Sequence, residues 1–169
     1  KLSFFGIAAI NIQGQTVSSF FGFGRKPYKR NDSNIPFYHY EDKENNKDEH
    51  PSRTAIRSLD TIIIDEISTL RADILDAIDT FLRKNGGNPK KPFGGKEMIF
   101  FGDPFQLEPV LSDKDFEKII YTENGYNPKE TFFFSGKTFE EKPHLLVKKE
   151  LTKLYRQKDE EFSDLLDRI

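Results

Sequence analysis

The chain has no cysteine and no tryptophan, and only one methionine and three histidines among its 169 residues. Without cysteine there is no disulfide, thiolate nucleophile or zinc ribbon, and three histidines leave little material for a histidine-based metal site. The absence of cysteine also fits an intracellular protein. Phenylalanine, by contrast, occurs 17 times, so we expect an aromatic core.

Long apolar segments are also missing. The longest run, FFGIAAI at 4–10, is far shorter than the roughly 18 to 20 residues that cross a bilayer. We therefore expect no membrane span and no signal peptide. Neither sign of charge dominates, because 26 basic and 28 acidic side chains give a net charge of −2. Bulk attraction to nucleic acid is excluded, so any contact with DNA must be local.

Residues 25–58 are rich in charge, asparagine and serine and show no sustained period, which predicts a long solvated loop or polar insert. The beginning of this insert, RKPYKR at 25–30, is basic and contains Tyr28. A strip that faces nucleic acid is the alternative interpretation of this basic stretch.

A buried strand is predicted at 59–64, where three consecutive isoleucines precede Asp65 and Glu66. Apolar residues then recur every three or four positions and predict one helix: Leu70, Ile74, Leu75, Ile78, Phe81 and Leu82. We expect Ser68 to cap its beginning and the Asn-Gly-Gly at 85–87 to end it.

A second buried strand is predicted at 97–101 and ends at Gly102 and Asp103. Two such strands joined by a helix make a βαβ unit, and ligands of open parallel sheets bind just beyond the carboxyl ends of the strands. We also expect a strand and a short helix at the beginning of the chain, a strand at 131–134 and a last helix at 162–169.

The acidic pair at the first strand end suits nucleotide hydrolysis. A carboxylate at a strand tip can hold Mg²⁺, and a neighbouring glutamate can orient or deprotonate a water. At the second strand end, Asp103 and Gln106 flank a turn that contains Pro104, where a glutamine can contact a γ-phosphate and the attacking water. Each pattern alone also fits an ordinary solvated strand end.

Four segments in order are more specific: GIAAINI at 6–12, IIIDEIS at 62–68, FFGDPFQLEPV at 100–110 and LTKLYRQ at 151–157. Together they resemble the Pif-type DNA helicases, the 5′-to-3′ branch of superfamily one that also includes RecD-like enzymes. The resemblance implies an α/β fold: a RecA-like P-loop NTPase motor domain in which helices flank a parallel sheet.

The resemblance also implies chemistry and context. It implies an ATP-dependent DNA helicase that uses ATP and Mg²⁺, translocates on single-stranded DNA and acts at DNA forks in repair, recombination or telomere and genome maintenance. It implies an intracellular location, cytoplasmic in a bacterium and nuclear or mitochondrial in a eukaryote. We expect a monomer.

The implied roles are carried over residue by residue. Asp65 would coordinate Mg²⁺, and Glu66 would activate the attacking water. Gln106 would sense the γ-phosphate, and Arg156 would reach it as an arginine-finger-like group. Such an arginine neutralises charge on the transferring phosphoryl group.

The first motif departs from the family. The usual Pro-Thr before Gly-Ile-Ala-Ala is Phe4-Phe5 here, and the usual Thr-Ile-His-Ser is TVSS at 16–19. Ser18, Ser19 and Phe20 remain candidates for DNA contacts through phosphate hydrogen bonds and base stacking. The core is the favoured place for Phe20, as it is for Phe21 and Phe23.

A phosphate-binding loop of the form G-x-x-x-x-G-K-[ST] is not in the sequence. SGKT at 135–138 has Thr131 where the first glycine belongs and bulky aromatics between, and Gly94-Gly95-Lys96 is followed by glutamate. We therefore expect residues 1–169 to form part of a first RecA-like domain, from motif Ia to motif IV. This part would lack the first strand and the phosphate-binding loop and would be inactive alone.

Two other classes of function stay open. A metal-dependent nuclease would use Asp65, Glu66 and Asp103, provided that their carboxylates converge on one or two ions. A non-enzymatic DNA-binding module would use the basic residues of 25–30 together with the phenylalanine-rich segment.

Overall fold

A computed structural model describes most of the chain from Lys1 to Thr152, with the following positions excepted: 4, 25, 31, 39, 44–45, 50, 112–113 and 128–130. Arg156 and the helix expected at 162–169 lie outside the described residues.

The strands form one parallel sheet and one hairpin. The parallel sheet has the order β2-β1-β5-β6. Its strands are β1 (Leu2–Ser3), β2 (Gln15–Thr16), β5 (Thr61–Asp65) and β6 (Glu97–Phe100). Ser3 pairs with Asp65, and Ile64 pairs with Phe100. Because all four strands run in one direction, their carboxyl ends lie at the same edge of the sheet.

Helices and turns connect these strands. The α-helices are α1 (Gly6–Asn11), α2 (Val17–Phe21), α3 (Pro51–Ser58), α4 (Ala72–Asn85), α5 (Lys114–Lys118) and α6 (Lys137–Glu141). The single-turn elements are η1 (Ile67–Thr69), η2 (Pro92–Gly95), η3 (Ile119–Glu123), η4 (Phe133–Ser135) and η5 (Pro143–Leu145). The predicted strand and short helix at the beginning of the chain are confirmed by β1 and α1.

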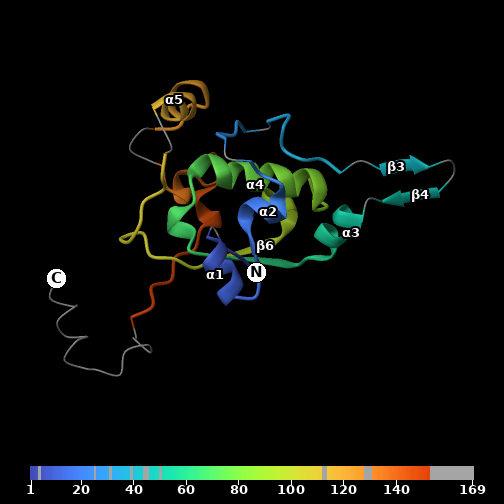
Figure 1. The fold of residues 1–169 in the computed structure, drawn as a ribbon, viewed down its shortest axis with the longest axis horizontal. Helices are drawn as coiled ribbons and strands as arrows, with labels where there is room; N and C mark the ends of the chain where they lie inside the picture. Colours follow the sequence, from blue (N-terminus) through green and yellow to red (C-terminus); the bar gives the residue numbers. More distant parts are fainter. Residues whose placement is uncertain are drawn as a thin grey trace.

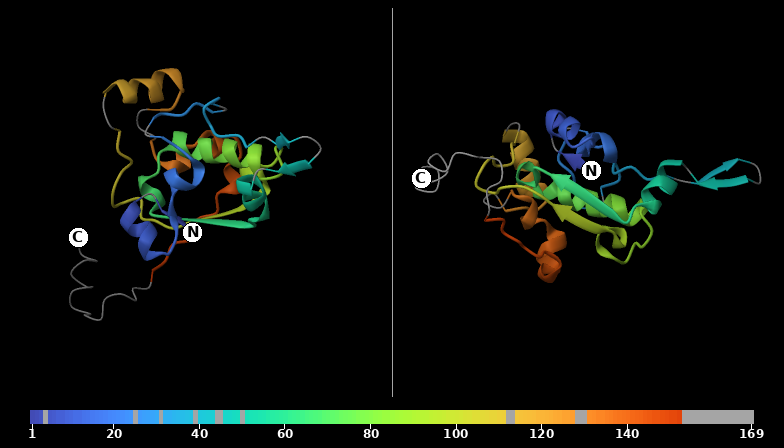
Figure 2. Two further views of the ribbon diagram at one scale, coloured as in Figure 1. Left: turned by 45° about the vertical axis from the view of Figure 1, so that its right-hand side comes forward. Right: turned by 90° about the horizontal axis from the view of Figure 1, so that it is seen from below.

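The βαβ unit is also confirmed. In β5, Ile62 and Ile64 are buried while the alternate residues are half-exposed, so one face of the strand carries the core contacts. Figure 1 shows α4 along the sheet, and Figure 2 shows α2 and α6 on opposite sides of α4. Helix α4 ends at Asn85 as expected, but it begins at Ala72 because Ser68 lies in the 3-10 turn η1.

The core is aromatic, as the composition predicts. Phe21 of α2 and Phe81 of α4 are fully buried, and their rings meet edge to face at 5.1 Å. Phe23 stacks on Phe21 at 5.4 Å, and Tyr28 packs against Phe23 at 5.0 Å. The rings therefore join α2 to α4 and carry the core into the following segment.

The expectation of a purely solvated insert at 25–58 is wrong. Tyr28 and Ile35 are only 1% and 2% exposed. The segment then forms an antiparallel hairpin of β3 (Tyr40–Lys43) and β4 (Asn46–Glu49), and it closes with α3. Figure 1 and Figure 2 show this hairpin projecting from the body of the molecule. Isolated apolar residues anchor the insert, and they leave no periodic pattern in the sequence.

The strand expected at 131–134 is wrong as well. Only Phe132 makes a strand-like bridge, to Arg71, and the following residues form the turn η4. Phe133 contacts Phe100 of β6 at 5.6 Å between ring centroids. The aromatic run therefore packs against a side chain of β6 without joining the sheet.

Among the described residues, no helix combines the length and the apolar character that a membrane span needs.

Candidate functional site

Two loops meet at the carboxyl edge of the sheet. One follows β5 and begins at Asp65 and Glu66, and the other follows β6 and contains Asp103 and Gln106. The backbone N–H of Ile67 donates to the carbonyl of Phe101 at 2.9 Å. The two predicted motifs are thus joined directly by their backbones.

Glycine at position 102 allows this close approach. A Cβ at Gly102 would lie 3.0 Å from the backbone nitrogen of Ile67 and 3.1 Å from that of Ser68. Real Cβ atoms are rarely so close to backbone atoms. A side chain here would therefore push the two loops apart.

The backbone at Glu66 is unusual. Its φ of 56° and ψ of 43° place a residue with a side chain in the left-handed region, at a cost of about 1 kcal/mol or more. The Glu66 N–H donates to Oδ1 of Asp65 at 3.1 Å. Asp65 still has the extended backbone of β5 whereas Glu66 is left-handed, so we expect the two half-buried side chains to leave the chain in different directions, which suits two separate roles.

Asp103 shapes the second loop. Its Oδ1 accepts from the Phe105 N–H at 2.9 Å, and its Oδ2 accepts from Nε2 of Gln106 at 3.0 Å. Its carbonyl accepts from the Gln106 N–H at 3.1 Å. Gln106 is exposed at the edge of the sheet, in a turn that Asp103 holds.

The side-chain oxygen atoms of these two loops suit Mg²⁺ that is bound together with a nucleotide. Mg²⁺ usually takes one or two protein carboxylates and fills its shell with water and phosphate oxygens. Asp65, half-buried at a strand tip, can supply one such ligand. Among the residues that the structure describes, no three acidic, histidine or cysteine side chains lie close enough together to form a metal site. That gives the nuclease alternative no support.

The predicted DNA-facing residues lie on α2. Ser18 and Ser19 are exposed, and the Ser19 N–H donates to Oγ1 of Thr16 at 3.1 Å, which caps the helix. Phe20 is half-buried and contacts Phe21 edge to face at 4.9 Å. Ser18 and Ser19 thus offer accessible hydroxyls, whereas Phe20 contributes to the rim of the core.

Comparison with known proteins shows the family to which the chain belongs. A model of the PIF1-like helicases matches residues 2–169. The chain belongs to the PIF1-like helicase family.

Individual relatives agree with this assignment. "ATP-dependent DNA helicase PIF1" of Saccharomyces cerevisiae is 33% identical over 97% of this chain, which covers 16% of that protein. The Pif1 helicase from Bacteroides in complex with ADP-AlF3 and ssDNA has a TM-score of 0.74 and 35% identity. It is matched over 99% of this chain and 35% of its own.

A solved Pif1 helicase from Candida albicans has a TM-score of 0.62 and 27% identity over 99% of this chain and 32% of its own. The fold is therefore the RecA-like α/β motor-domain fold that the resemblance implies. The chain spans about a sixth of the length of the yeast relative and about a third of these solved chains.

The Gly-Lys-Thr sequence at 136–138 binds a carboxylate of the protein itself. The backbone N–H groups of Lys137 and Thr138 donate to Asp76 at 2.8 and 3.0 Å, and Oγ1 of Thr138 donates at 2.8 Å. The amides that would face a phosphate in a true phosphate-binding loop are thus engaged inside this PIF1-like fold.

Asp76 belongs to a set that the sequence analysis missed. Asp73, Asp76 and Asp79 lie three residues apart on α4, and all are buried. Asp73 accepts from the Tyr28 N–H at 3.0 Å, and Asp79 accepts from the Phe93 N–H at 2.5 Å. Their regular spacing on one helix face was the available signal, but acidic residues opposite an apolar stripe normally face solvent.

The basic stretch is engaged within the molecule. Arg30 donates through both terminal nitrogens to Glu141, and Lys29 lies 3.6 Å from a carboxylate oxygen of Glu123. The Arg30 hydrogen bond holds the pKa of the Glu141 carboxyl below its usual range. Lys26 lies over the ring of Tyr28 at 5.0 Å. These contacts favour a structural role for the stretch, and Arg25 lies outside the described residues.

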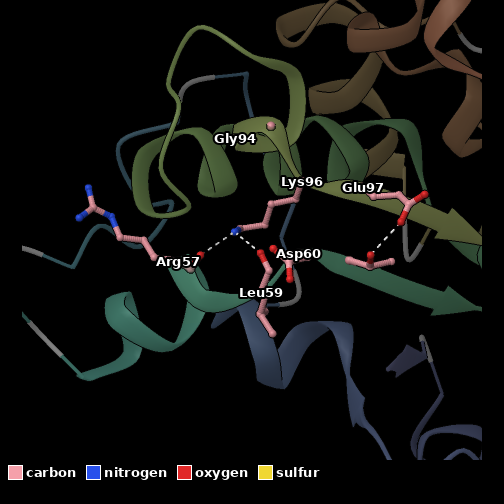
Figure 3. Close-up of a pocket in the computed structure, with 8 residues that line it drawn as sticks. Arg57, Leu59, Asp60, Gly94, Lys96 and Glu97 are labelled. Carbon is pink, nitrogen blue, oxygen red and sulfur yellow. Dashed lines mark hydrogen bonds between the residues drawn. The ribbon is translucent and has the colours of Figure 1, made fainter.

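A pocket lies at the opposite, amino edge of the sheet (Figure 3). It has a volume of about 360 Å³ and lies between the beginnings of β5 and β6. Nζ of Lys96 donates to the Leu59 carbonyl at 2.6 Å and to the Arg57 carbonyl at 3.3 Å, and burial lowers the pKa of Lys96. Lys96 therefore ties the end of α3 to β6, away from the acidic loops.

Proposed function

We propose that this chain is part of the nucleotide-hydrolysing motor of an ATP-dependent DNA helicase. The observation that carries the proposal is the backbone hydrogen bond from Ile67 to Phe101, which joins the Asp65–Glu66 loop to the Asp103–Gln106 loop at the carboxyl edge. Relatives named ATP-dependent DNA helicases support the activity.

Each site residue has a proposed role. Asp65 holds Mg²⁺, and Mg²⁺ when bound neutralises charge on the phosphates. Glu66 takes a proton from the attacking water. Gln106 contacts the γ-phosphate and that water, and Arg156 supplies a positive charge to the transferring phosphoryl group.

The proposal requires a phosphate-binding loop from outside these residues. The sequence contains no G-x-x-x-x-G-K-[ST] motif, and Gly-Lys-Thr at 136–138 is engaged with Asp76. The outer edge of β6 pairs with no other described strand, which leaves room beside it for a further strand. We infer that residues 1–169 alone do not hydrolyse ATP.

The substrate of the proposed motor is single-stranded DNA next to a fork, with translocation from 5′ to 3′. A related Pif1 structure holds ssDNA, and another is described at forked dsDNA. The accessible hydroxyls of Ser18 and Ser19 are the proposed phosphate contacts. We place the protein inside the cell, as a monomer acting in DNA repair, recombination or telomere maintenance.

The test uses the full-length protein that contains this chain. Glu66→Gln keeps the size of the side chain but removes the base, so DNA-stimulated ATP hydrolysis should fall by about 10²-fold or more. Glu117→Gln, on the exposed face of α5, is the matched control and should hydrolyse ATP at the wild-type rate. Hydrolysis unaffected by Glu66→Gln would contradict the proposal, as would Mg²⁺-dependent DNA cleavage without nucleotide.

A further inference from the structure

Hydrogen bonds fix the backbone of Glu66 on both sides of the residue. Its N–H donates to Asp65, and the next N–H along the chain, that of Ile67, donates to Phe101. Its carbonyl accepts twice from Thr69, at 2.9 Å from Oγ1 and at 3.3 Å from the backbone nitrogen. A left-handed residue with a side chain persists only when its surroundings fix it, and these contacts do so.

Thr69 is the least expected of these partners. It lies in the turn η1, is only 5% exposed, and reaches back three residues to the carbonyl of Glu66. This is the local side-chain-to-backbone pattern that threonine favours. Valine has nearly the same shape without the hydroxyl, so Thr69→Val removes the hydrogen bond and leaves the packing in place.

We propose that Thr69 is a positioning residue that aims the Glu66 carboxylate at the attacking water. The inference rests on the proposed function, because it assigns Thr69 to the same hydrolytic step. The hydroxyl contacts no reacting atom and acts only through the carbonyl of Glu66. Its loss lets the backbone at Glu66 relax out of the left-handed region and moves the base.

The experiment measures steady-state ATP hydrolysis by the full-length protein on single-stranded DNA. Thr69→Val should lower kcat about fivefold, the effect of one ordinary hydrogen bond, and leave KM for ATP within twofold of wild type. Thr69→Ser restores the hydroxyl and should recover the wild-type kcat. Thr138→Val, which removes a buried threonine hydrogen bond to Asp76, should lower the thermal midpoint but not kcat.

A double-mutant cycle separates positioning from general stability. In the Glu66→Gln background the base is already absent, so adding Thr69→Val should change kcat by less than twofold. A fivefold further loss in that background would overturn the inference, as would a wild-type kcat for Thr69→Val alone. Either result leaves the proposed function intact, because that function is overturned by different outcomes: ATP hydrolysis unaffected by Glu66→Gln, or Mg²⁺-dependent DNA cleavage without nucleotide.

Discussion

Ile67 and Phe101 share a backbone hydrogen bond of 2.9 Å across the carboxyl ends of two neighbouring strands. Phe101 in turn donates to the carbonyl of Ile64, also at 2.9 Å. The ladder between β5 and β6 therefore continues beyond the strands and into both acidic loops. We therefore expect a displacement of one loop to move the other, and the proposed function requires Glu66 and Gln106 to meet one nucleotide.

Gly102→Ala tests this coupling. The new methyl group would meet the backbone of Ile67 and Ser68 at 3.0 to 3.1 Å, so the two loops must separate by a few tenths of an ångström. Because the proposed hydrolysis depends on the relative placement of Glu66 and Gln106, we expect kcat for ATP to fall at least tenfold. The strain should cost about 1 to 3 kcal/mol of unfolding free energy.

Gly24→Ala is the matched control for this change. No heavy atom lies within 4 Å of a Cβ built at Gly24, and its backbone is not left-handed. Its kcat and unfolding free energy should stay within error of wild type. If Gly102→Ala behaved like Gly24→Ala in both measurements, the two loops would not be coupled by this contact.

Asp76→Asn tests the buried carboxylate that binds Tyr126 and the beginning of α6. Asp76 accepts four hydrogen bonds: from the Tyr126 hydroxyl at 2.6 Å, from the Lys137 and Thr138 amides, and from Oγ1 of Thr138. Asparagine presents an NH₂ to donors that need an acceptor. We expect a loss of about 3 kcal/mol in unfolding free energy, measured with urea.

Tyr126→Phe is the graded comparison for Asp76→Asn. It removes only one of the four donors, so about 1.5 kcal/mol should be lost. Equal losses from the two changes would show that the Tyr126 hydroxyl carries most of the effect and that the amides of 137 and 138 do not depend on Asp76.

The parts of the fold that the sequence predicted correctly are those with a local pattern. The isoleucines of 62–64 and the apolar spacing of 74–82 express burial directly, so β5 and most of α4 were found. The acidic strand ends were found because a parallel sheet brings them to one edge. The left-handed backbone of Glu66 and the hydrogen bond from Thr69 to its carbonyl were not predicted, because no pattern of residue types indicates either one.

Two incorrect predictions, a solvated insert at 25–58 and a strand at 131–134, both involve segments whose structure depends on long-range contacts. Tyr28 is buried because Phe23 lies against its ring and Asp73 accepts its backbone N–H, 45 positions along the chain. Nothing within the polar segment around Tyr28 predicts either partner. The aromatic run at 132–134 has strand propensity, but it packs beside β6 as a turn, so tertiary contacts outweigh propensity.

Alkaline pH should destabilise the folded protein. Burial, with the neighbouring Asp76 carboxylate, raises the pKa of Tyr126 above its ordinary value of 10.0. Above pH 10 the unfolded chain loses this proton while the folded protein keeps it, so the unfolding free energy falls as pH rises. The slope contributed by one such tyrosine approaches about 1.4 kcal/mol per pH unit. Burial also raises the pKa of Tyr28 and Tyr121, which add to the decline.

Tyr126→Phe isolates the contribution of Tyr126 to the pH dependence of the unfolding free energy. Between pH 7 and 9 the variant should be less stable than wild type by a constant amount, because Tyr126 is protonated in both states. From pH 10 to 11.5 that difference should shrink, since only the wild type carries the linkage. Urea unfolding at half-unit intervals of pH measures both slopes. Parallel curves across the whole range would mean that Tyr126 ionises as readily in the folded protein as in the unfolded chain.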